Sequence, residues 1–98
     1  MTDDRTVHAK MRTFDGDTLE LVRYDKSGTW YTETTGTKPD PMTGRRAVEP
    51  KRTRVNMSTA VGIALLAHKA ENGEWFHARP GGRTLDARVR RAIESKRR

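Results

Sequence analysis

The first 34 residues constrain the fold most, because apolar and polar side chains alternate along them and two turn sequences interrupt the alternation. The turn sequences, Asp15-Gly16-Asp17 and Asp25-Lys26-Ser27-Gly28, consist largely of residue types that favour tight turns. A period of two residues is typical of half-buried strands, and short turns join antiparallel strands. The pattern therefore predicts a three-stranded antiparallel sheet within residues 6–34.

The side-chain pattern also predicts how the first two strands pair. With a three-residue turn, Phe14 opposes Thr18, and Arg12 opposes Glu20 in a favourable cross-strand pair. One face of the sheet is then aliphatic and includes Trp30, so we expect a helix to cover it. The other face allows two interpretations: ordinary packing with solvent exposure, or an aromatic contact surface. Its predicted members are Phe14, Val22, Tyr24, Tyr31, His8, Lys10, Arg12, Glu20 and Glu33.

Residues 35–57 lose the alternation and are predicted to form a long basic loop that is punctuated by Gly and Pro. Loops of this length are usually mobile or functional. A short strand at 46–49 or 53–55 is also compatible with the sequence.

A core helix is predicted over residues 58–72, with Ser58 or Thr59 as its N-cap and Asn72-Gly73 as its stop signal. Its apolar residues cover nearly the whole circumference, which indicates burial on more than one side. The sheet and a second helix could cover these sides, or the same helix of a second protomer in a homodimer.

The remaining chain is predicted to form a short extended segment at 74–78, a basic C-terminal helix at 84–95 and a frayed tail at 96–98. One apolar stripe follows helical spacing along the last helix. It consists of Leu85, Val89, Ala92 and Ile93. Residues 1–98 are therefore expected to form a single small α+β domain.

The positive charge is distributed unevenly along the chain. Residues 1–34 carry five Lys/Arg and seven Asp/Glu, whereas residues 35–98 carry fifteen and six. Fourteen of the twenty basic residues are Arg, whose planar guanidinium suits phosphate and carboxylate groups. The main functional prediction is a small non-enzymatic protein that binds nucleic acid, with DNA as the first candidate, through the basic loop and the C-terminal helix. The predicted contact residues are Arg45, Arg46, Lys51, Arg52, Arg54, Arg83, Arg88, Arg90 and Arg91.

The alternative prediction is an adaptor or inhibitor that binds an acidic partner protein. Aromatic side chains are common anchors at protein interfaces, and the candidates are Trp75, Phe76, Tyr24 and Tyr31. The high Arg and low Lys content is characteristic of bacterial or phage genes of high GC content, so a phage protein acting on a host protein is included in this hypothesis.

Several classes of function are disfavoured by the composition. The chain has no Cys, which excludes disulfides, thiolate metal sites and cysteine nucleophiles and fits a reducing cytoplasm. The longest apolar run has eight residues, too few to span a membrane, and the first residues lack the pattern of a signal peptide. His8, His68 and His77 are too scattered to indicate a metal site. We expect neither a cofactor nor catalysis, since no nucleophile with a base and a carboxylate can be identified.

Overall fold

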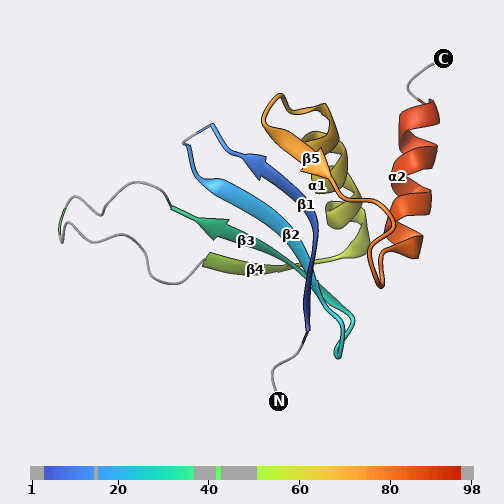
Figure 1. The fold of residues 1–98 in the computed structure, drawn as a ribbon, viewed down its shortest axis with the longest axis horizontal. Helices are drawn as coiled ribbons and strands as arrows, with labels where there is room; N and C mark the ends of the chain where they lie inside the picture. The colour runs from blue at the N-terminus through green and yellow to red at the C-terminus, as the bar shows by residue number, and fades with distance from the viewer. Residues whose placement is uncertain (1–3, 15, 37–41, 43–50, 96–98) are drawn as a thin grey trace.

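The computed structural model describes residues 4–14, 16–36, 42 and 51–95 (Figure 1), and these form an α+β structure with one antiparallel sheet of five strands and two helices. The strands are β1 (Arg5–Arg12), β2 (Thr18–Tyr24), β3 (Thr29–Thr35), β4 (Lys51–Val55) and β5 (Gly73–Trp75), and the helices are α1 (Met57–Lys69) and α2 (Arg83–Ser95). Their order in the sheet is β4-β3-β2-β1-β5.

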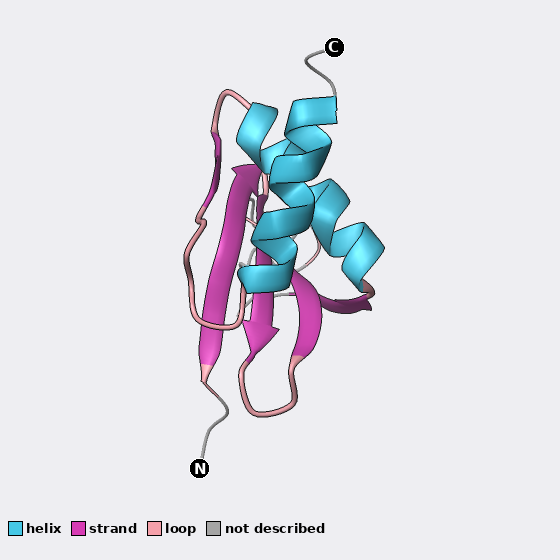
Figure 2. Cartoon of the chain, turned by 90° about the vertical axis from the view of Figure 1, so that its right-hand side faces the viewer, coloured by secondary structure: helices cyan, strands magenta, loops and turns pink. Residues whose placement is uncertain are grey.

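Both helices lie on one side of the sheet, in front of the strands in Figure 2. Helix α1 packs mainly over β1 and β5, and α2 packs against α1. The opposite side of the sheet, called the open face below, has no helix over it among the described residues.

The core lies between α1 and the sheet. Ala60, Ala64 and Ala67 are fully buried at the spacing of one helix face, and their small side chains let the helix backbone approach the strands. Trp30 and Trp75 fill the space around them. The apolar stripe predicted on α2 also belongs to this core: Leu85 and Val89 are fully buried, and Ile93 packs against them.

The start of α1 differs from the sequence-based prediction. Asn56 is the N-cap, and its side-chain oxygen accepts a hydrogen bond of 2.8 Å from the backbone N–H of Thr59. Asn is at least as good an N-cap as Ser or Thr, and the helix begins directly after it at Met57. Ser58 and Thr59, the predicted caps, therefore lie inside the helix.

The helix also ends earlier than predicted: Lys69 is its last residue and Ala70 is the C-cap. Gly73, which was predicted to stop the helix, is the first residue of β5. A Cβ on Gly73 would lie 2.5 Å from the backbone oxygen of Ala67, so glycine is needed here for the close approach of β5 to α1.

The pairing of β1 with β2 also corrects the predicted register. Arg12 lies opposite Thr18, and Lys10 lies opposite Glu20. The ladder ends at this Arg12–Thr18 pair, so residues 13–17 connect the two strands, and within this connection the backbone N–H of Thr13 donates to the carbonyl oxygen of Asp17 at 2.7 Å. The shift is two residues, an even number, so Met11 and Ala9 still share a face with Leu19 and Leu21 as predicted.

A β-bulge at His8 interrupts β1, and it moves this residue to the face opposite the predicted one. The pairs Val7 with Val22 and Ala9 with Leu21 leave His8 without a partner in the β1–β2 ladder. His8 and Ala9 both point toward the helices and are both buried, with the His8 ring 4.6 Å from the Trp30 ring.

The sheet contains two strands beyond the predicted three. The possible strand at 53–55 is part of β4, which extends from Lys51 to Val55 at one edge of the sheet. The other option, at 46–49, is outside the described residues. At the opposite edge, the predicted extended segment 74–78 overlaps the last two residues of β5, a strand of three residues that pairs with β1.

Candidate functional site

The open face combines two tyrosines, from β2 and β3, with arginines from β1 and β4. Trp30 and Val55, which pair with each other, face the helices, so the next residue along each strand faces the other way. Tyr31 and Arg54 form this next cross-strand pair on the open face. The helix-side core thus determines the direction of the polar side chains on the open face.

Glu33 is the centre of a polar cluster on the open face. Although charged, Glu33 is only 2% exposed. It accepts a hydrogen bond from the Tyr24 hydroxyl, and its carboxylate lies 2.8 Å from Arg5 and 3.3 Å from Arg52. Burial alone would raise the pKa of Glu33, but the hydrogen bonds from Tyr24 and Arg5 and the two guanidinium charges outweigh burial and lower this pKa. Glu33 is therefore an ionised anchor that fixes the neighbouring side chains.

The two tyrosine rings of the open face contact each other and a guanidinium. The Tyr24 and Tyr31 rings meet edge to face with their centroids 5.5 Å apart. The Arg52 guanidinium lies 4.8 Å from the Tyr24 ring and 5.6 Å from the Tyr31 ring. Burial and the hydrogen bond to Glu33 raise the pKa of Tyr24, so its hydroxyl remains protonated. Cation–π contact and the ion pair with Glu33 together restrict the position of Arg52.

The open face carries more positive than negative charge. By strand alternation, its charged side chains are Arg5, Lys10, Arg12, Arg52 and Arg54 against Glu20, Glu33 and Glu74. Arg54 is exposed and has no acidic partner among the described residues. A half-exposed aromatic pair beside such a cation offers stacking and phosphate binding within one surface.

The predicted nucleic-acid contact residues are on different sides of the molecule. Arg45 and Arg46 are outside the described residues. Lys51 is on the helix side of β4, whereas Arg52 and Arg54 are on the open face. The remaining four are all exposed on α2, which is separated from the open face by α1 and the sheet (Figure 2): Arg83, Arg88, Arg90 and Arg91. Among the residues that the structure describes, Arg52 and Arg54 therefore do not share one continuous contact surface with the arginines of α2.

The predicted protein-contact residues are similarly divided. Trp75 is buried, and its indole N–H donates a hydrogen bond of 3.1 Å to the carboxylate of Asp86. Phe76 is half-buried, with the Arg79 guanidinium 5.2 Å from its ring. Tyr24 and Tyr31 remain accessible on the open face. Of the predicted protein-contact residues, the two tyrosines are thus on the open face, whereas the tryptophan belongs to the core.

Sequence reasoning did not find the role of Arg5, and it did not recognise Glu33 as the centre of a cluster. Arg5 of β1 reaches Glu33 of β3 through the hydrogen bond from its Nε at 3.0 Å, across the one intervening strand, β2. The bulge in β1 changes the face on which Arg5 lies, so alternation along the sequence does not place Arg5 beside Glu33.

No family model, curated protein or solved structure matches this chain. Among residues 4–14, 16–36, 42 and 51–95, no three His, Asp or Glu side chains gather as metal ligands would. In the same part of the chain, neither helix has the length and apolar character needed to cross a membrane.

Proposed function

We propose that this protein binds nucleic acid, DNA in the first instance, by laying a single strand across the open face of its sheet. The observation that carries the proposal is the arrangement around Arg52, whose guanidinium lies beside both tyrosine rings while Arg54 next to it is exposed and unpaired among the described residues. The protein is proposed to act by binding and not by catalysis.

The chemistry of this face suits single strands better than duplexes. Bases in a single strand are free to stack on half-exposed rings such as Tyr24 and Tyr31, and the exposed Arg54 can neutralise a phosphate beside them. Reading a duplex groove, by contrast, requires a protruding helix or ribbon. On the open face the described residues offer a sheet surface without a helix.

The proposal is tested by fluorescence anisotropy with a labelled DNA single strand of about 20 nucleotides and its duplex across a salt series. We expect the single strand to bind more tightly, with affinity that falls as salt rises. Arg54→Ala should reduce the salt slope by about 0.7, the value for one phosphate contact in a single strand. Tyr31→Leu, which keeps apolar volume beside Tyr24, should weaken binding by about 1 to 3 kcal/mol through lost stacking.

Lys51→Ala is the matched control, because it removes one charge from the same strand but from the helix side. It should weaken binding less than Arg54→Ala. Equal losses would mean that only net charge matters and would remove the open face as the site. Absence of binding at low salt would refute the proposal altogether, and tighter binding of an RNA strand of the same sequence would change its substrate from DNA to RNA.

A further inference from the structure

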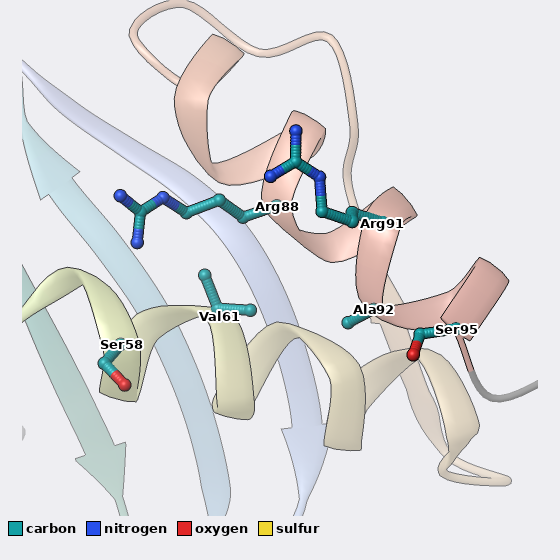
Figure 3. A pocket seen from close by; sticks show the side chains of 6 residues that line it. All are labelled: Ser58, Val61, Arg88, Arg91, Ala92 and Ser95. Carbon is teal, nitrogen blue, oxygen red and sulfur yellow. The ribbon is translucent and has the colours of Figure 1, made fainter.

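A groove of about 360 Å³ lies between α1 and α2, on the helix side of the molecule (Figure 3). Val61 of α1 and Ala92 of α2 give it an apolar floor, and Arg88 and Arg91 stand along its α2 side. Arg88 extends from α2 toward the beginning of α1 (Figure 3). The groove therefore combines an apolar floor with two cations on one rim.

Small side chains keep the groove open. Leu85 and Val89 of α2 are buried in the core and hold the two helices together. Further along α2 the facing residue is Ala92, and Ser58 and Ser95 line the ends of the groove. Since none of these three side chains is large, the space above Val61 stays unfilled.

The charges around the groove lack an acidic counterpart within the described residues. No ion pair is formed there by Arg88 or Arg91, and the first turn of α1 contains no acidic residue. Asp86, the acidic residue in the first turn of α2, is buried and accepts hydrogen bonds from the Trp75 indole and from the backbone N–H of Ala78. A ligand with carboxylates beside an apolar side chain would complement this arrangement.

We propose that the groove binds an acidic amphipathic helix of a partner protein. An apolar side chain of that helix enters above Val61 and Ala92, and its carboxylates pair with Arg88 and Arg91. Helix α2 has 13 residues and is about 20 Å long, which is enough to accompany about three turns of a partner helix.

Two other occupants fit the groove less well. A second copy of this chain carries the same net charge of +7, and its α1 and α2 expose few carboxylates with which to complement the arginines. Nucleic acid would gain no stacking, because no aromatic side chain lines the groove. The inference is independent of the proposed function, since the groove and the open face are on opposite sides of the sheet.

The probe is a synthetic helical peptide of about 15 residues with Leu at every third or fourth position and Glu flanking the Leu stripe. It is titrated into the full-length ¹⁵N-labelled protein while amide chemical shifts are recorded. We expect saturable shifts centred on Val61, Ala92 and Ser95. A second peptide with Lys in place of each Glu should bind at least about tenfold more weakly.

Charge-reversed variants give the decisive comparison. Arg88→Glu with Arg91→Glu should weaken the acidic peptide at least about tenfold. Arg90→Glu is the matched control, because this residue is rotated by about 200° from Arg88 around the helix axis and does not line the groove. A single Arg91→Glu variant is compared with it at equal charge, and it should weaken binding more.

The proposal is overturned by any of three results: no saturable shifts, shifts centred on the open face instead of the groove, or equal losses in Arg90→Glu and Arg91→Glu. DNA binding, measured in the same variants, separates this proposal from the first one. The open-face site predicts that Arg91→Glu and Arg90→Glu affect DNA affinity equally, whatever the peptide result.

Discussion

Lowering the pH from 7 to about 4 should destabilise the protein by about 3 kcal/mol, and His8 is the residue we expect to be responsible. Its side chain is fully buried, and neither ring nitrogen has a hydrogen-bond partner among the described residues. Gly82 covers the ring so closely that a Cβ at this position would lie 2.7 Å from it. A protonated imidazole would therefore carry its charge in a place with no room for hydration.

The magnitude follows from the pKa of this histidine. Burial lowers the pKa of His8 from 6.5 to about 4; Asp86 and Asp25 oppose the shift, while Arg23 and Arg79 add to it. Between these two pH values the unfolded chain binds a proton that the folded protein excludes, so stability is full above about pH 6.5 and falls as the pH drops toward 4. At about 1.4 kcal/mol for each pKa unit, the whole shift corresponds to between about 3 and 4 kcal/mol, of which about 3 kcal/mol is lost by pH 4, where His8 is half-protonated in the folded protein.

Urea unfolding at a series of pH values, followed by tryptophan fluorescence, measures this loss. His8→Leu has no titrating group and should show a much flatter stability between pH 6.5 and 4. The same substitution at the exposed His68 is the control and should retain the wild-type slope.

An NMR titration of the ring protons checks the same argument even where a variant folds poorly. The His8 resonance should titrate with a midpoint near 4. A midpoint near 6.5, or parallel pH profiles of the wild type and His8→Leu, would refute the reasoning.

Three further predictions concern single substitutions. Gly73→Ala should lower the free energy of unfolding in urea by about 1 to 3 kcal/mol, because its Cβ would meet a backbone oxygen at 2.5 Å. Gly62→Ala, whose Cβ would have no atom within 4 Å, should instead raise it by about 0.5 to 1 kcal/mol. Equal effects of the two substitutions would contradict the structure. In Asp86→Asn the side chain keeps a single oxygen, which can accept only one of the two hydrogen bonds that Asp86 accepts, so urea unfolding should show a loss of about 1 to 3 kcal/mol. Glu94→Gln, at an exposed position of the same helix, is the control and should change stability by less than about 0.5 kcal/mol. Glu33→Gln should destabilise the protein near neutral pH, and the loss of stability should shrink at acid pH, where Glu33 of the wild type becomes protonated. Because the substitution releases the guanidinium groups of Arg5 and Arg52, it should also steepen the salt dependence of DNA binding. Unchanged anisotropy curves would argue against the open-face site.

The fold was predictable where local pattern and packing agree. Alternation identified the three strands β1, β2 and β3, and helical spacing identified the buried stripe of α2. The strand β5 has only three residues, too few to show a period, and it exists because Gly73 lets it pack against α1. Strand β4 carries three basic residues among five, a composition that occurs at sheet edges but equally in loops.

The candidate site was predictable only in part. The abundance of Arg pointed to Arg52 and Arg54, but charge alone could not tell which side of the sheet each side chain would face. Trp75 is as apolar when it anchors an interface as when it fills a core, so its place in the core is known only from the three-dimensional packing. The cluster around Glu33 depends on pairing between strands distant in the sequence, which no local pattern encodes.

The bulge at His8 means that β1 is a regular strand with one residue inserted. If His8 were removed, Val7 and Ala9 would become neighbours on opposite faces, as normal alternation requires, and both could keep their present partners in β2. The insertion thus adds a side chain to the core without changing the direction of any other residue in the strand. Deleting His8 should therefore disturb the strand pairing less than deleting Val7 or Ala9 would. Its main consequence would be an unfilled space under Gly82, where the His8 ring now lies between the strand and the loop.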